Sequence, residues 1–268
     1  MQRWALGIEY DGSQFHGFQR QRHEPRTVQG ALEAALSFVG DEAIHLVCAG
    51  RTDAGVHATA QVVHFDAHAI RRANAWRHGG NSRCPPGVTI HWAHPVPQEF
   101  SARFSARRRR YTYVLTDARS APAIGRAFVA HSRVGLDATA MQAAALTLVG
   151  ENDFSSFRAA GCQARSPVRQ IMSFTVQRRG VTLIFDVTAN AFLQHMVRNI
   201  VGTLCLVGKG EIAPADVAAI LARRDRRAAG PAASAAGLYL TQVVYDADYG
   251  FAMAVRPPWF LVGPDGLC

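Results

Sequence analysis

The chain has 268 residues, 49% of them hydrophobic, which is enough apolar material for one or two domains with buried cores and argues against disorder. Basic residues outnumber acidic ones by 29 to 20, and the net charge of +9 favours a polyanionic partner such as nucleic acid. No stretch approaches about 18 consecutive apolar residues, and the amino terminus has no signal-peptide pattern. The sequence therefore predicts a cytoplasmic protein without a membrane span.

The cysteines predict no metal site. They are odd in number, far apart in the sequence and without a CxxC pair, so neither a zinc site nor a disulfide framework is expected. We expect free, partly buried thiols at Cys48, Cys84, Cys162, Cys205 and Cys268.

Hydrophobic periodicity and turn residues predict the elements of the first half of the chain. Thr27 can cap a helix and Gly40 can end it. In chain order we expect a strand at 3–9, that helix from 28, strands at about 43–48 and 60–66, a short helix within 68–80 and a strand at 88–97.

The second half predicts a similar order, in which Arg179-Gly180 is a hairpin signal between two strands. We expect a strand at 111–115, a helix at 137–149, strands at 168–178 and 181–189, a strongly amphipathic helix at 192–207, an inserted helix at about 214–224 and a strand at 238–245. Each half thus has the order β-α-β-β-α-β. The predicted fold class is α+β, with two ferredoxin-like (split βαβ) domains, 1–103 and 104–268, and a catalytic cleft between them.

The segment with the most chemical information is Gly50-Arg51-Thr52-Asp53-Ala54-Gly55-Val56-His57-Ala58. It follows a predicted strand and contains two glycines, which indicate a tight loop. Arg51 and Asp53 are two positions apart, so in an extended segment they lie on the same side. Taken alone, Asp-Ala-Gly is an ordinary turn sequence, because Asp and Gly are favoured in turns for backbone reasons.

This loop resembles the active-site signature of the TruA family of tRNA pseudouridine synthases. Further segments resemble that family's motifs in the same order, over about residues 4–245: YDGSQFHGFQRQ at 10–21, TVQGAL at 27–32, FSA at 104–106 with RRYTY at 109–113, NDFSSFR at 152–158, NAFLQHMVRN at 190–199 and GLYL at 237–240. The chain departs from the family pattern at Phe18, at 48–49, at 81–86 and at Ala236, none of which is a predicted catalytic residue.

The resemblance implies an isomerase that converts uridine to pseudouridine at positions 38–40 of the tRNA anticodon stem–loop. It implies Asp53 as the catalytic nucleophile, Arg198 as its ion-pair partner and Tyr111 against the flipped uracil. It implies no metal or organic cofactor, and a homodimer that binds tRNA.

Exposed arginines are the natural candidates for contacts to RNA phosphates. We expect Arg51, Arg20, Arg109 and Arg110 to bind RNA, although a run such as 107–110 can equally be a solvated linker. Two rival functions stay open: an RNA-binding module without catalysis, and a hydrolase that uses some of the eleven histidines. No HExxH or GxSxG signature supports the hydrolase.

Overall fold

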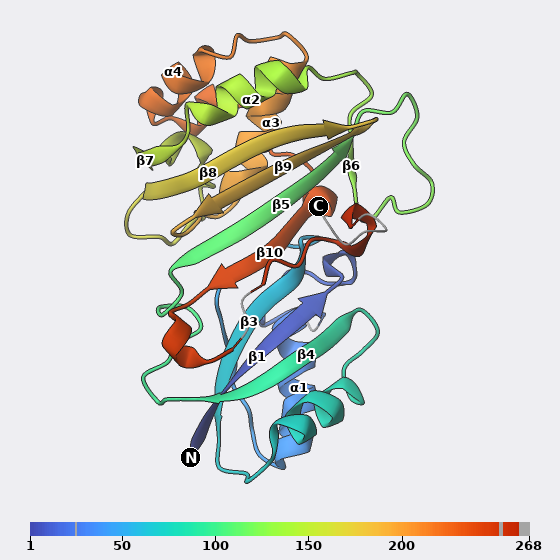
Figure 1. Ribbon diagram of the computed structural model, residues 1–268, viewed down its shortest axis with the longest axis vertical. Coiled ribbons are helices and arrows are strands. Elements are labelled where there is room, and N and C mark those ends of the chain that lie inside the picture. The colour runs from blue at the N-terminus through green and yellow to red at the C-terminus, as the bar shows by residue number, and fades with distance from the viewer. Residues whose placement is uncertain (25, 252–253, 263–268) are drawn as a thin grey trace. The chain divides into compact units, whose positions relative to one another are not determined.

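Figure 1 shows the computed structural model of the chain, which describes residues 1–24, 26–251 and 254–262. It is an α+β protein with long, mostly antiparallel strands and few helices. The described residues form two compact units. Unit 1 is Met1–Arg108 together with the segment that begins at Tyr239, and unit 2 is Arg109–Leu238. Within the described residues no helix is both long and apolar enough to cross a membrane.

Unit 1 is built around β1, which pairs antiparallel with β3 on one side and β4 on the other, while the short β2 pairs with β3. Strand β10 adds a parallel pairing to β3 through Tyr239 opposite His57. The elements are β1 (Gln2–Tyr10), α1 (Val28–Gly40), β2 (Val47–Cys48), β3 (His57–Ala67), a π-helical turn (Ala75–Gly79), β4 (Val88–Val96) and β10 (Leu238–Val244). The pairing of β10 explains why the structure groups the last segment with unit 1, whereas the domain prediction 1–103 and 104–268 counted it with the second domain. That domain prediction stays a prediction.

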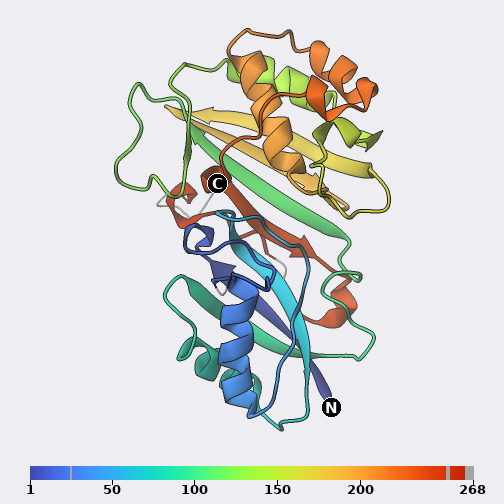
Figure 2. The ribbon, with the colours of Figure 1, turned by 180° about the vertical axis from the view of Figure 1, so that it is seen from behind.

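Both faces of the unit 1 sheet are covered, so six of the nine positions of β1 are buried. Helix α1 packs on one face (Figure 2). On that face the Trp76 ring lies 6.2 Å from Trp4 and 4.9 Å from Phe65. On the other face the Trp92 indole packs directly against Gly7. A Cβ at Gly7 would lie 2.0 Å from the indole nitrogen, so this packing requires glycine. Phe251 stacks on Trp92 at 4.9 Å, so the carboxyl-terminal segment completes this layer.

Unit 2 has the strand order β5-β9-β8-β7, with antiparallel pairing along it, and the short β6 pairs parallel to β5. Its helices gather on one side of this sheet (Figures 1 and 2). The elements are β5 (Arg108–Thr116), β6 (Ala130–His131), α2 (Ala138–Leu146), β7 (Gly150–Asp153), β8 (Val168–Arg179), β9 (Thr182–Ala189), α3 (Met196–Gly208) and α4 (Asp216–Arg223).

Most predicted elements are confirmed, and their local causes are visible. Thr27 Oγ1 accepts from the Gly30 N–H and caps α1, as expected. The hairpin between β8 and β9 turns at Gly180, which has a φ of +59°. The prediction for α3 was wrong at its start: the helix begins at Met196 and not at 192, because His195 adopts a left-handed conformation (φ +61°) directly before it.

Candidate functional site

The catalytic-loop candidate, residues 50–56, connects β2 to β3 in unit 1. Arg51 is exposed, Thr52 is buried and Asp53 is half-buried, so the loop presents the carboxylate while its neighbour anchors the backbone. Gly55 has a φ of +78°, and the Val56 N–H donates to the Asp53 carbonyl at 3.1 Å. This closes a turn directly after Asp53, as the two glycines of the segment predicted.

Thr52 ties the candidate catalytic loop to the loop that follows β1. Its carbonyl accepts from the Phe18 N–H at 3.0 Å, and its hydroxyl lies 2.8 Å from the hydroxyl of Tyr10. Gly17 packs against the same backbone with a φ of +91°, and a Cβ there would lie 3.1 Å from the Thr52 carbonyl oxygen. Two segments that the sequence keeps more than 30 positions apart therefore form one rigid surface beside Asp53.

Two buried polar side chains support the same loop from below. Gln61, fully buried on β3, accepts from the Gly50 N–H at 3.3 Å and donates to the Gly50 carbonyl at 2.6 Å. At the other end His57 is 1% exposed, and its Nδ1 accepts from the Gly12 N–H at 3.1 Å. The candidate catalytic loop is thus fixed at both ends by side chains of the sheet.

The sequence motif contained His57, but sequence reasoning gave it no role. Its ring stacks on Tyr239 at 4.7 Å, and its Nδ1 lies 3.3 Å from Asp11. Burial acts to raise the pKa of Asp11, but hydrogen bonds from Ser13 and Gln14 outweigh it and hold that pKa below its ordinary value. The Asp11 carboxylate therefore stabilises the first loop through its hydrogen bonds with Ser13 and Gln14. The position of His57 directly after a turn and at the start of a strand was the signal that could have marked it as a support residue.

In unit 2, Tyr111 lies on β5 and is 7% exposed. Its ring forms a T-shaped pair with the Phe192 ring, at 5.0 Å between centroids and 84° between planes, so the neighbouring loop fixes the orientation of the phenol. Tyr113, on the same strand, is fully buried, and its hydroxyl donates to the Ser234 carbonyl at 2.9 Å. Burial raises the pKa of Tyr113 far above its ordinary value. The two tyrosines of the YxY pattern therefore differ: Tyr113 belongs to the core.

Arg198 is half-buried in the first turn of α3. Its Nε donates to the Ala233 carbonyl at 2.8 Å, and its own carbonyl accepts from the Ala233 N–H at 2.9 Å. The same segment packs closely against Gly202, where a Cβ would lie 1.7 Å from the Pro231 carbonyl oxygen. A cation in the first turn of a helix opposes the helix dipole, so helix stability alone does not account for an arginine there.

The four arginines predicted to bind RNA lie in different surroundings. Arg51 is exposed, and Arg20 is exposed with its guanidinium 3.5 Å from Glu33. Arg109 is only 9% exposed and donates to the Asn190 carbonyl at 2.9 Å. Arg110 forms an ion pair with Asp186 at 2.6 Å. The guanidinium groups of Arg109 and Arg110 thus already have partners in unit 2, and their contact with RNA stays a prediction.

The cysteine prediction agrees with the structure where it can be compared. Cys48 is buried, and Cys84, Cys162 and Cys205 are half-buried free thiols. Burial raises the pKa of both Cys84 and Cys205 to about 11, so these two thiols are unreactive near neutral pH. Cys268 lies outside the described residues.

Comparison with known proteins identifies the family. A family model described as tRNA pseudouridine synthase matches residues 7–105 and 144–246. The chain is 49% identical over 259 residues to tRNA pseudouridine synthase A of Aeromonas salmonicida, covering 96% of each chain. It is 50% identical over 257 residues to the protein of the same name from Cronobacter sakazakii, covering 96% of this chain and 95% of the relative. Among solved structures, a Cbf5–Nop10–Gar1 complex matches with a TM-score of 0.37 and 12% identity, over 88% of this chain and 48% of that one.

Asp53 and Arg198 fall within the matched ranges, as do both loops that shape the surface beside Asp53, whereas Tyr111 lies between the two ranges. The chain belongs to the tRNA pseudouridine synthase family. It is therefore an isomerase, and the resemblance stated from the sequence motifs is confirmed.

Proposed function

We propose that this protein isomerises uridine to pseudouridine at positions 38–40 of the tRNA anticodon stem–loop, with Asp53 as the catalytic carboxylate. The observation that carries the assignment is the anchoring of the catalytic loop, where Thr52 is locked by Tyr10 and Phe18 while Asp53 stays half-exposed. Such anchoring suits a group that must meet a reacting atom with little freedom of its own. The near full-length similarity to proteins named tRNA pseudouridine synthase A supports the substrate.

The chemistry requires a carboxylate and no external reagent, because substrate and product are isomers. The bond between N1 of uracil and C1′ of ribose breaks, the base turns, and a bond forms between C5 and C1′. The C5 proton is lost and N1 gains a proton. The Asp53 carboxylate can add covalently at C1′ or at C6 of the base, or stabilise the developing positive charge on the sugar. In each route Asp53 must be ionised.

Tyr111 and Arg198 complete the proposed site. Access to a uridine in a folded RNA requires the base to leave its stack, and an aromatic ring gives the flipped base a surface to pack on. The edge contact with Phe192 supports this role, since it holds the Tyr111 ring in one orientation. Arg198 is proposed to pair with Asp53 and keep it anionic when water is excluded. Support comes from its unfavourable place in the first turn of α3 and from the Ala233 carbonyl that fixes its Nε.

The finer fold prediction belongs to the same proposal: two ferredoxin-like domains, 1–103 and 104–268, with the catalytic cleft between them. In unit 1 the strand order is β4-β1-β3, and β2 pairs with β3 on the side away from β1. Helix α1 lies between β1 and β2 along the chain, and this order supports a split βαβ arrangement. The homodimer, the cytoplasmic location and RNA contacts by Arg51, Arg20, Arg109 and Arg110 are proposed on the family resemblance and the net charge of +9.

The experiment is tritium release from tRNA labelled at C5 of uridine, since the C5 proton leaves only if the new bond forms. Asp53→Asn should reduce release at least 1,000-fold, because it removes the charge and almost no volume, and tRNA binding should persist. Asp41→Asn is the matched control: Asp41 is exposed in a left-handed conformation (φ +55°) that asparagine also adopts. Turnover by Asp53→Asn near that of Asp41→Asn would refute the assignment.

A further inference from the structure

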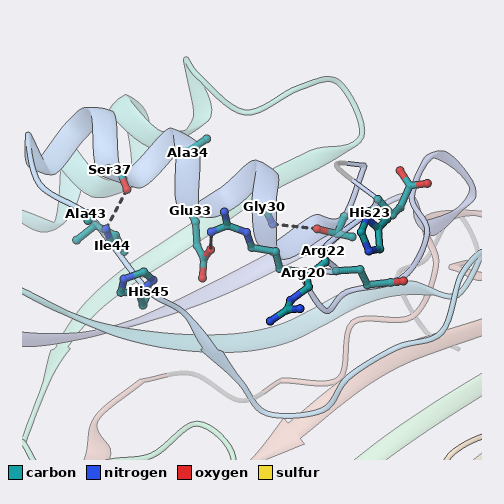
Figure 3. Close-up of a pocket in the computed structure, with 13 residues that line it drawn as sticks. Arg20, Arg22, His23, Gly30, Glu33, Ala34, Ser37, Ala43, Ile44 and His45 are labelled. Carbon is teal, nitrogen blue, oxygen red and sulfur yellow. Dashed lines mark hydrogen bonds and ion pairs between the residues drawn. The ribbon is translucent and has the colours of Figure 1, made fainter. Parts of the chain in front are cut away.

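A hollow of about 590 Å³ opens on unit 1 beside the loop that supports the catalytic turn. Its walls are the turn at 20–24, one side of α1 and residues 43–45, as Figure 3 shows. The volume falls within the range of about 300–1,000 Å³ found for ligand sites. Most of the residues that line it are polar or charged, with two arginines and two histidines among them.

The carboxylates of the two acidic residues in the hollow already have hydrogen-bond partners within the protein. Glu33 is buried, and its carboxylate accepts from Gln29 Nε2 at 2.8 Å and from the Leu46 N–H at 3.0 Å, with Arg20 at 3.5 Å. Glu24 accepts from the Arg26 N–H at 2.9 Å. These acids therefore hold the walls together and do not neutralise the remaining basic side chains.

Arg22 and His23 occupy the tip of the turn. A backbone bridge between Gln21 and Glu24 closes the turn, and Gln21 Nε2 donates to the His16 carbonyl at 3.0 Å. Arg22 and His23 are both exposed, and the described part of the chain gives their side chains no hydrogen bond or ion pair. Two basic groups are thus presented on a fixed turn, with their donors open to a ligand.

A short chain of hydrogen bonds joins this hollow to the catalytic loop. The Arg20 N–H donates to Gln29 Oε1 at 3.0 Å, and the Gln29 N–H donates to the Phe18 carbonyl at 2.9 Å. The Phe18 N–H donates in turn to the Thr52 carbonyl, next to Asp53. A ligand held in the hollow would therefore lie at a fixed distance from the catalytic loop of the same unit.

We propose that this hollow binds a phosphodiester group of the substrate RNA, with Arg22 and His23 as the donors that contact it. The proposal rests on the function proposed above, since it assigns a contact to the same RNA. Phosphate is the anion that an open, basic, polar surface selects, and phosphate contacts set the position of an RNA strand without reading its sequence. Placing this contact beside the Phe18–Thr52 link lets it align the strand with Asp53.

The test compares two double variants that remove the same groups. Arg22→Ala with His23→Ala alters the hollow, while Arg77→Ala with His78→Ala removes a second exposed Arg-His pair whose side chains have no partner in the described structure. Net charge is the same in both. We expect the first variant to raise the Kd for tRNA about tenfold and to reduce the slope of log Kd against log salt by about 1, since about one phosphate contact is lost. The Arg77/His78 variant should leave the Kd and the salt slope close to the wild-type values. Both double variants should have the melting temperature of the wild type.

Equal Kd values and salt slopes for the two double variants would overturn the proposal. Wild-type protein that releases no tritium from C5-labelled tRNA would count instead against the proposed function, so the two failures are distinguishable. Titrations with inorganic phosphate and with uridine 5′-monophosphate, at constant ionic strength, separate the RNA backbone from a free phosphate. Saturable binding of either one that is lost in the Arg22/His23 variant, with tRNA affinity unchanged, would assign the hollow to a small phosphate and also overturn the proposal.

Discussion

Replacing Gly17 with alanine should disturb catalysis through the backbone of the catalytic loop. Gly17 has no predicted catalytic or binding role. A Cβ at this position would lie 3.1 Å from the Thr52 carbonyl oxygen, 3.3 Å from the Ala54 nitrogen and 3.4 Å from the Asp53 carbonyl carbon. All three are backbone atoms, which move only if the loop moves. The substitution therefore displaces Asp53 by a few tenths of an ångström without touching its side chain.

The magnitude follows from two separate effects. The φ of +91° at Gly17 is unfavourable for alanine, and a left-handed residue with a Cβ costs about 1–2 kcal/mol of folding stability. A misplacement of about 1 Å can reduce catalysis about 100-fold. If the logarithm of the rate loss is proportional to the displacement, a shift of about 0.3–0.5 Å reduces the single-turnover rate about 4- to 10-fold.

Gly125→Ala separates the two effects, because Gly125 has a φ of +78° and a Cβ there meets nothing within 4 Å. Thermal unfolding should show both variants destabilised by a similar amount. Single-turnover tritium release should be slowed only in Gly17→Ala. Equal rates for the two variants would refute the reasoning that the first loop positions Asp53.

Three further predictions concern single side chains. Tyr111→Phe and Tyr111→Ala should both bind tRNA but lower turnover, the second by more because it also loses the ring; full activity in Tyr111→Ala would remove this residue from the site. Arg198→Met should lose most turnover with only a small change in melting temperature. Arg198→Lys should restore little of that turnover, because lysine lacks the planar guanidinium with two parallel donors. A lysine variant as active as the wild type would contradict the proposed pairing. Burial lowers the pKa of His64 from 6.5 to about 4, and its Nδ1 accepts from the Ala102 N–H, so the native state excludes a proton that the unfolded chain binds. This contribution is complete above pH 6.5 and is lost as pH falls towards 4, by about 3 kcal/mol in all; urea unfolding of His64→Gln should show a flatter decline over this window than the wild type, and parallel curves would exclude the effect.

Local signals were sufficient to predict most of the elements that make up the fold. Thr27, with its capping hydroxyl, and Gly180, with its positive φ, act within a few residues of their own position, so the sequence reveals them. The predicted strand at about 43–48 forms only at Val47–Cys48. Its first half fails because the Leu46 N–H donates to the buried Glu33 carboxylate instead of to a neighbouring strand. That contact joins positions 13 apart and has no signature in the local pattern.

In the candidate site, too, features set by local sequence were predicted and contacts between distant positions were not. Asp53 was predicted from its motif, and the turn at Gly55 from composition. The support from Gln61 and Tyr10 was not predicted, since a polar residue on a strand gives no sign of which distant backbone group it will bond. The run 107–110 was ambiguous for the same reason: partners such as Asp246, for Arg107, and Asp186, for Arg110, lie far along the chain.

The interrupted course of unit 1 along the chain has a consequence for its synthesis on the ribosome. Residues 109–238 must all be translated before Tyr239 can pair beside His57 and before Phe251 can cover Trp92. Until then the nascent amino-terminal segment exposes an unpaired edge at the start of β3 and an uncovered aromatic face, both of which promote aggregation. Unit 2 is continuous and can complete its fold first, so the unit that carries Asp53 is the last to mature although its first strand is made first.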